Sequence, residues 1–229
     1  MMRRKNICTC ICALTISLLA MLPQAAGAQR RKAPPAAPDT IPLFRGVAVS
    51  VDVVGAAQMW FGNYGQYEAA ARLNLKDRYF PIVEFGIGRT NHEDEVTFIR
   101  YKTSAPYVRI GCDFNLLKNK HDIYRVYLGA RYAFTSFKFD VSRHNLVDPI
   151  SGIDAPYGGT DIKATCHWAE LVASVDAKII GPLRLGWSVR YRNRFRQTSG
   201  ELGDPWYVPG FGKSGSSTLG ATFNIIFEL

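Results

Sequence analysis

The stretch Thr218-Leu-Gly-Ala-Thr-Phe-Asn-Ile-Ile-Phe-Glu-Leu229 alternates in the character of its side chains. A period of two is the pattern of a β-strand whose two faces meet different surroundings. One face is wholly apolar and consists of Leu219, Ala221, Phe223, Ile225, Phe227 and Leu229. The strand ends on an apolar residue with an aromatic residue two positions before it. This ending favours a closed membrane barrel, because the last strand of such a barrel pairs with the first and leaves no edge.

The same alternation recurs upstream and predicts further strands. We expect them at about 44–54, 66–76, 79–88, 104–116, 123–140, 164–179 and 183–197. The phase of the fifth strand becomes unclear beyond Thr135, which indicates a β-bulge. Short turns alternate with longer segments near 55–65, 89–103, 141–163 and 198–217. This asymmetry is typical of an outer-membrane barrel with short periplasmic turns and longer extracellular loops.

A soluble sandwich or lipocalin-like barrel would show the same period with its apolar side chains inside. The composition of the two faces distinguishes these folds, because a lipid-facing band must be uniformly apolar whereas a small lumen is polar. One face is almost wholly Val, Leu, Ile, Phe and Ala. The other carries glycines and the carboxylates Asp52, Glu68, Glu84, Asp113, Glu170 and Asp176. We therefore predict an all-β fold, an eight-stranded antiparallel transmembrane barrel of the outer membrane.

The chain divides into three segments. Residues 1–28 begin with a basic segment at Arg3, continue in an apolar run and end in the small residues Ala26-Gly27-Ala28. This order predicts a cleaved secretory signal peptide. Residues 29–43 are basic and rich in proline, which predicts an extended periplasmic leader. Residues 44–229 form the expected barrel, so we expect the protein in the outer membrane of a Gram-negative cell.

Composition excludes several function classes. The expected mature chain of 201 residues (229 minus 28) has 25 basic (28 minus three) and 19 acidic residues, a mild excess without a basic cluster. We therefore expect no nucleic-acid partner. Charges or glycines break each later apolar run well below the roughly 18 residues of a spanning helix. A porin channel is also disfavoured, because open channels need roughly 16 strands.

An arginine row marks the predicted lumen. Alternation along the seventh strand places its arginines on the face opposite the apolar one: Arg184, Arg190, Arg192, Arg194 and Arg196. Buried charges must be paired, and Arg184, Arg190 and Arg192 have lumen carboxylates such as Glu84, Asp113 and Glu170 as candidate partners. We predict a lumen closed by this ion-pair network. The alternatives are an anion path or a site for lipopolysaccharide phosphates.

The remaining reactive side chains give no specific signal. Cys112 and Cys166 lie at different predicted heights in the barrel, too far apart for a disulfide, so we expect two free thiols. His92, His144 and His167 lie in or near predicted outer loops, where a lipid-modifying enzyme would need a histidine beside a serine or carboxylate. Their spacing matches no pair of metal ligands. We expect no catalytic residue, cofactor, metal or small-molecule substrate.

The last predicted loop contains Asp204-Pro-Trp-Tyr-Val-Pro-Gly-Phe-Gly212. Its prolines and glycines predict a stiff set of turns. A packed loop of this kind can present a binding surface, which makes Trp206, Tyr207 and Phe211 a candidate partner surface. The alternatives are an interfacial aromatic girdle or a lid that packs on its own barrel.

Several stretches carry a family resemblance. They are Tyr101-Lys-Thr-Ser-Ala-Pro-Tyr-Val-Arg-Ile-Gly111, Arg131-Tyr-Ala-Phe-Thr-Ser-Phe-Lys-Phe139, Trp168-Ala-Glu-Leu-Val172, Gly186-Trp-Ser-Val-Arg-Tyr191 and Pro205-Trp-Tyr-Val-Pro-Gly-Phe-Gly212. With them, the chain resembles a family of small outer-membrane β-barrels of unknown function from anaerobic Gram-negative bacteria of gut and mouth. More distantly it is similar to barrel subunits of envelope secretion or assembly machines. The resemblance implies an outer-membrane barrel and brings no catalytic residues.

These patterns lead to one expected function and one alternative. We expect a non-enzymatic structural or interaction protein in contact with the lipid bilayer and lipopolysaccharide. It would serve as an accessory subunit of an envelope secretion or assembly complex, with an envelope protein as its partner. The alternative is a lipid-modifying enzyme acting at the extracellular rim.

Overall fold

The computed structural model describes residues 42–119, 122–143, 157–198 and 203–229. The expected signal peptide and nearly all of the expected leader lie outside these residues. The described elements are, in order, β1 Phe44–Asp52, α2 Val53–Phe61, β2 Tyr64–Leu75, β3 Tyr79–Glu93, β4 Ile99–Asn115, β5 Tyr124–Arg143, β6 Tyr157–Ile180, β7 Leu183–Thr198, β8 Tyr207–Val208, β9 Gly212–Lys213 and β10 Ser217–Glu228.

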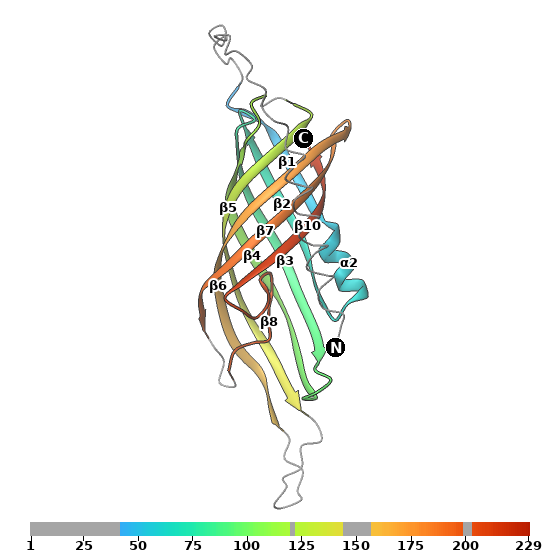
Figure 1. The fold of residues 1–229 in the computed structure, drawn as a ribbon, viewed down its shortest axis with the longest axis vertical. Coiled ribbons are helices and arrows are strands. Elements are labelled where there is room, and N and C mark those ends of the chain that lie inside the picture. Colours follow the sequence, from blue (N-terminus) through green and yellow to red (C-terminus); the bar gives the residue numbers. More distant parts are fainter. Residues whose placement is uncertain (1–41, 120–121, 144–156, 199–202) are drawn as a thin grey trace, which may run out of the picture. The chain divides into compact units, whose positions relative to one another are not determined.

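Eight of these strands form a closed antiparallel barrel in the order β1-β10-β7-β6-β5-β4-β3-β2 (Figure 1). The last strand closes the barrel by pairing with the first, with Val49 opposite Phe227 and Val51 opposite Ile225. The predicted eight-stranded antiparallel barrel is therefore confirmed. Because β1 and β10 pair at residues 48–52 and 224–228, their backbone N–H and C=O groups there are hydrogen-bonded, as the interior of a membrane requires.

The apolar face of the wall points outward. Val49 and Ile110 are 43% and 57% exposed, whereas Glu84 and Arg190 are 1% and 3% exposed. In a water-soluble barrel the two sets would be exchanged, because apolar side chains would fill the interior. The orientation is therefore that of a transmembrane barrel, with a lipid-facing outer surface and a polar lumen.

The strands extend further than alternation indicated. Strand β3 runs to Glu93 and β4 begins at Ile99, so the loop expected near 89–103 is reduced to residues 94–98. This short turn is held by Asp94, whose Oδ1 accepts hydrogen bonds from the backbone of Val96 (3.0 Å) and Thr97 (2.7 Å). The expectation failed because strand ends beyond the lipid carry polar side chains on both faces, so the apolar period is lost.

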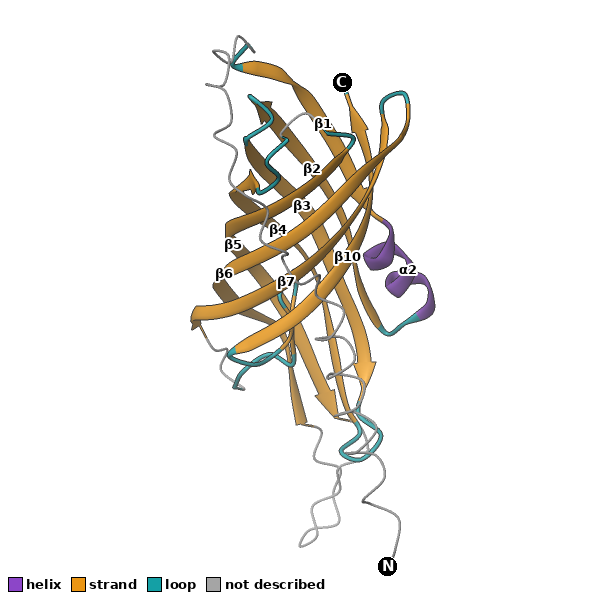
Figure 2. Ribbon diagram, turned by 45° about the horizontal axis from the view of Figure 1, so that its top comes forward, coloured by secondary structure: helices purple, strands orange, loops and turns teal. Residues whose placement is uncertain are grey.

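Helix α2 occupies a segment that we expected to be a loop. Asp52 caps it by accepting hydrogen bonds from the backbone of Val54 and Gly55, each at 3.1 Å. The helix lies beside β1, β2 and β10 (Figures 1 and 2). The sequence Val-Val-Gly at its start has low helix propensity, and only the cap at Asp52 indicated a helix. In the described part of the chain, no helix is both long and apolar enough to cross a membrane.

The half of β5 nearer the loop end keeps its alternation. Thr135, Phe137 and Phe139 continue the inward face, and the bulge falls between Phe139 and Val141. The alternation became unreadable beyond Thr135 because the lumen itself changes from charged to aromatic at this height. A pattern of inward polar and outward apolar residues cannot follow such a change.

Candidate functional site: a closed lumen

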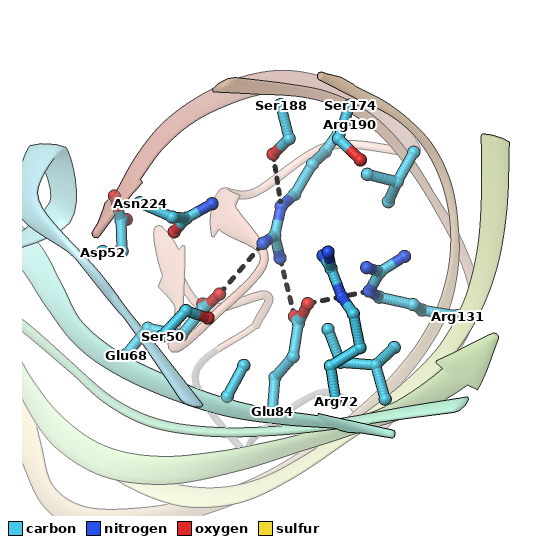
Figure 3. A pocket seen from close by; sticks show the side chains of 13 residues that line it. Ser50, Asp52, Glu68, Arg72, Glu84, Arg131, Ser174, Ser188, Arg190 and Asn224 are labelled. Carbon is cyan, nitrogen blue, oxygen red and sulfur yellow. Dashed lines mark hydrogen bonds and ion pairs between the residues drawn. The ribbon is translucent and has the colours of Figure 1, made fainter. Parts of the chain in front are cut away.

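The centre of the lumen is built around the carboxylate of Glu84 on β3 (Figure 3). It accepts hydrogen bonds from Arg109 Nη1 (3.1 Å), Arg131 Nε (2.8 Å) and Arg190 Nη1 (2.7 Å). Alternation along β3, β4, β5 and β7 brings these four side chains to the inner wall. A buried charge without a partner costs several kcal/mol, so each group stabilises the buried position of the others.

Asp113 on β4 extends this group towards the end of the barrel that holds the C-terminus, which we call the terminus-bearing end. It accepts a two-pronged contact from Arg131, with Nη1 at 2.8 Å and Nη2 at 3.0 Å. A second arginine, Arg72, approaches Asp113 at 3.2 Å. The fork of Arg131 therefore joins Asp113 to Glu84, and the planar geometry of this contact restricts the register of three neighbouring strands.

Glu170 on β6 lies where the charged region of the lumen meets the aromatic region on the side of the loop end. Its Oε1 accepts a hydrogen bond from Trp168 Nε1 (2.6 Å) and lies 2.8 Å from Arg109 Nε and 3.5 Å from Arg192 Nε. Arg109 also contacts Glu68, which accepts a hydrogen bond from the Tyr107 hydroxyl (2.6 Å). Four arginines and four carboxylates of the middle lumen thus share one network: Arg109, Arg131, Arg190 and Arg192 with Glu68, Glu84, Asp113 and Glu170.

A second group of charges lies towards the terminus-bearing end. Arg184 Nη2 is 2.7 Å from Asp176, and Arg184 Nη1 is 3.3 Å from Glu228. Arg125 Nη1 also pairs with Glu228, at 2.7 Å. The ion pairs between described lumen residues join eight arginines to seven carboxylates: Arg45, Arg72, Arg109, Arg125, Arg131, Arg184, Arg190 and Arg192 with Glu68, Asp77, Glu84, Asp113, Glu170, Asp176 and Glu228. With Asp52 at the helix cap, the charges of this set balance.

The other half of the lumen is filled by residues 205–213, which we call the plug. Its backbone carbonyls accept hydrogen bonds from the wall: Gly210 from Arg109 Nη2 (2.7 Å), Phe211 from Arg192 Nη1 (2.9 Å) and Tyr207 from the Tyr101 hydroxyl (2.9 Å). Gly210 has a φ of +82°, and a Cβ there would lie 2.5 Å from the ring of Tyr107. Only glycine combines this backbone conformation with so close an approach.

The plug is packed in an apolar cluster formed by β4, β5 and β6. Phe211 makes an edge contact with Trp168 at 5.9 Å, and Tyr101 stacks on Phe139 at 5.3 Å. The buried members are Tyr101, Ala105, Tyr107, Ala133, Phe137, Phe139, Ala164, Cys166, Trp168, Tyr207, Val208 and Phe211. The lumen therefore has a charged half and an aromatic half, and the aromatic half is closed by the chain's own loop.

These positions correct the interpretation of Trp206, Tyr207 and Phe211 as a partner surface. Tyr207 and Phe211 are 2% and 0% exposed and lie inside the barrel. Trp206 is only partly buried and stacks on His92, with ring centroids 4.2 Å apart. The alternative of a self-packing lid describes the observed loop, because burying these rings in the aromatic half of the lumen removes more apolar surface from water than exposure at the rim would.

The predicted ion-pair residues Arg184, Arg190, Arg192, Glu84, Asp113 and Glu170 all lie in the lumen. The arginine row is shorter than expected, because a bulge between His167 and Trp168 shifts the register and Arg196 is exposed. Sequence reasoning did not select Arg109 and Arg131, which make three and two buried ion pairs in the middle of the lumen. Their positions on the inward face of the fourth and fifth strands were the available signal.

The remaining candidates occupy separate places. Cys112 is free and exposed on the outer wall, and Cys166 is free and buried in the aromatic cluster. His167 makes a 2.7 Å hydrogen bond with the Tyr132 hydroxyl. Neither His92 nor His167 has a serine hydroxyl or carboxylate as a hydrogen-bond partner among the described residues, and His144 lies outside them. The described residues hold no cluster of three or more potential metal ligands.

The free space in the charged half is small. The cavity lined by Glu68, Glu84, Arg131 and Arg190 has a volume of about 20 Å³, which is space for about one water molecule. Towards the terminus-bearing end, a wider vestibule of about 350 Å³ is bordered by Arg125, Arg184 and Glu228. The vestibule therefore ends at the ion pairs, and the plug closes the lumen beyond them.

Together these features define a class: a small transmembrane β-barrel of the outer-membrane type whose lumen is closed by buried ion pairs and an inserted loop. The chain belongs to the family described as domain of unknown function DUF6048, whose model matches residues 6–228. The predicted membership in an uncharacterised family of small outer-membrane barrels is therefore confirmed. The expected origin in anaerobic bacteria stays a prediction.

Solved structures with similar folds are small outer-membrane proteins. The attachment invasion locus protein Ail of Yersinia pestis, solved with the heparin analogue sucrose octasulfate, is 11% identical, with 80% of this chain and 98% of that chain covered and a TM-score of 0.39. Neisserial surface protein A is 13% identical, with coverages of 81% and 99% and a TM-score of 0.43. CarO2 of Acinetobacter baumannii is 10% identical, with coverages of 82% and 99% and a TM-score of 0.42. The comparison with curated proteins gave no match.

Proposed function

We propose that this protein is a non-conducting barrel of the Gram-negative outer membrane with a structural and interaction role and no enzymatic activity. The observation that carries the proposal is the double closure of the lumen. Buried ion pairs around Glu84 fill the middle, and the plug fills the aromatic half. A protein whose interior is occupied by its own side chains must act through its outer wall and its loop end.

The outer wall has a basic rim at the loop end, directly beyond its apolar band. On β3, the outward residue Ile87 is followed on the same face by Arg89. The exposed outward basic residues of β3 to β6 are Arg89, Arg100, Lys102, Lys138 and Lys163, which we call the basic belt. Lys138 pairs with the exposed Asp161 at 3.1 Å, which leaves four members without a carboxylate within ion-pair distance among the described residues.

This position favours contact with phosphate groups of lipopolysaccharide. Long basic side chains at the edge of a lipid-facing band reach the headgroup level, where anionic groups attract them. If the loop end faces outward, as we propose from the short turns at the opposite end, the basic belt lies at the level of the lipopolysaccharide phosphates. The contact would anchor the barrel and set its depth in the membrane.

Conductance tests the closed lumen. Purified full-length protein inserted in planar bilayers should show background conductance, because no ion can pass the Glu84 network without breaking buried pairs. A reproducible single-channel current from the wild-type protein would overturn the proposal. A porin of about 16 strands inserted by the same procedure would serve as the positive control.

A finer proposal is that the barrel is an accessory subunit of an envelope secretion or assembly complex. It rests on the closure of the lumen by the described residues, which leaves the loop end and the predicted basic leader as candidate contact surfaces. Mild crosslinking in native envelopes, followed by purification and identification of crosslinked species, tests it. A defined partner crosslinked through residues of the loop end would support the subunit role, and recovery of a lone monomer under conditions that capture known complexes would contradict it.

A further inference from the structure

The barrel wall has a seam in its loop-bearing half. Strand β1 ends at Asp52, where its last pair with β10 is Asp52 opposite Asn224. Strand β10 continues from there to Ser217 with β7 on one side and no strand on the other. Strand β2 likewise extends from Ala69 to Tyr64 without β1. The two strand edges that border this seam are separated by helix α2 instead of a strand (Figures 1 and 2).

Helix α2 covers one side of the seam better than the other. Its Gly55 packs closely on β2, where an added Cβ would lie 2.7 Å from the carbonyl oxygen of Gln66. On the β10 side, Phe223 N donates to Asp52 Oδ1 at 3.3 Å, and the described residues 217–223 pair with β7 on one edge and with no strand on the edge that faces the seam. Unpaired backbone groups are costly at membrane depth unless protein, water or a ligand satisfies them.

A cavity of about 290 Å³, which we call the seam cavity, opens along this edge. Its lining changes character from the outside to the inside of the wall. Leu219 and Ala221 belong to the outward face of β10, and Leu219 is 72% exposed. The polar part of the lining includes the exposed Gln58 and Lys213, the partly buried Gln66 and the buried Arg192. The cavity therefore joins the lipid-facing surface to the buried Arg192.

Arg192 is the least completely paired arginine that lines this cavity or the central network. Its side chain is 9% exposed. Nη1 donates to the Phe211 carbonyl, while Nε lies 3.5 Å from Glu170 Oε1 and has no hydrogen-bond partner. Nη2 lies next to Gly220, where a Cβ would come within 3.0 Å of it, and has no acceptor among the described residues. A buried guanidinium donor without a hydrogen-bond acceptor, here Nε, is unfavourable, so the site is suited to an added anion.

The charges around the seam cavity favour the same kind of ligand. Lys213 is exposed, and its Nζ lies 5.7 Å from the ring of Tyr64, so its ammonium borders the cavity mouth. The carboxylate of the cavity is Asp52, whose oxygens already accept hydrogen bonds from the backbone of Val54, Gly55 and Phe223. Two cations therefore face one carboxylate that is occupied as a helix cap.

We propose that the seam cavity binds the phosphate-bearing headgroup of an anionic membrane lipid that enters sideways from the bilayer. The acyl chains would remain outside against Leu219, Ala221 and the outward face of β10, and the phosphate would be held by Arg192 and Lys213. Phosphate matches these groups because its oxygens accept charge-assisted hydrogen bonds from both. The site is separate from the basic belt, which lies on β3 to β6.

Native mass spectrometry of the purified full-length protein in detergent tests the proposal. The probes are dioleoyl phosphatidic acid, dioleoyl phosphatidylcholine and inorganic phosphate. We expect one tightly bound phosphatidic acid, with the zwitterionic lipid and inorganic phosphate each binding at least about tenfold more weakly, because each lacks either the net charge or the chains. Equal binding of the two lipids would refute recognition of the negative charge. Binding of inorganic phosphate as tight as that of phosphatidic acid would refute a membrane lipid as the ligand.

Two exposed substitutions keep the test independent of folding. Lys213→Glu should weaken phosphatidic acid binding by about tenfold or more, whereas the matched exposed change Lys118→Glu, on the turn after β4, should leave it unchanged. Ala221→Trp places a large side chain at the lipid-facing mouth and should also reduce binding while the barrel stays folded. Equal losses in Lys213→Glu and Lys118→Glu, or full binding in Ala221→Trp, would refute the seam cavity as the site.

Discussion

Replacing Glu84 with glutamine tests whether the ion-pair network determines the stability of the barrel. Glu84 is 1% exposed and receives hydrogen bonds from Arg109, Arg131 and Arg190 at 2.7 to 3.1 Å. Removing one partner of a buried ion pair costs about 3–5 kcal/mol. Each of the three arginines keeps another carboxylate in the structure, such as Asp113 for Arg131. We therefore expect a loss near the lower limit, about 3 kcal/mol in the free energy of unfolding.

The assay is reversible urea unfolding in lipid vesicles, followed by tryptophan fluorescence and by the mobility shift of folded barrel on gels without heating. The matched control is Glu93→Gln, an exposed glutamate at the end of the same strand, for which we expect a change within about 0.5 kcal/mol. Equal stability of the two variants would refute the reasoning. The double variant Glu84→Gln/Arg131→Met should lose less than the sum of the two single changes, because the pair is coupled.

Three further predictions address the plug, the wall and a turn. Gly88→Leu should displace the plug, because a Cβ at this position meets the plug backbone at 2.8 Å; faster proteolysis within residues 205–213 of a folded barrel would show this, and unchanged cleavage would argue against it. An apolar thiol reagent should label the exposed Cys112 in the folded protein and leave the buried Cys166 unlabelled until unfolding, as mass spectrometry of the two peptides would show. Hydrogen bonds from Thr97 hold the pKa of Asp94 below its ordinary value of 3.8, so the turn keeps this stabilisation above pH 3.8 and loses it as the pH falls through the lower folded value; an Asp94 titration by NMR at or above 3.8 would contradict it.

Much of the barrel was readable from the order of residues alone. Strict alternation over strands such as β10 and β7 indicated their number, their direction and which face meets lipid. The composition of the two faces also predicted the outward position of Val49 and the inward position of Glu84, because only a membrane barrel combines a uniform apolar face with a charged one. These properties are local to each strand, so they survive without knowledge of the neighbours.

The tertiary structure decided what each inward side chain meets. Whether the proline- and glycine-rich loop faces a partner or enters its own barrel depends on space for it in the opposite wall, such as that left by Gly88 on β3. The seam depends on β1 ending at Asp52 while β10 and β2 continue, a mismatch between strands far apart in the chain. Alternation is a property of one strand, whereas plug, seam and ion-pair partners are relations between strands. They arise only when closure of the ring brings the strands into register.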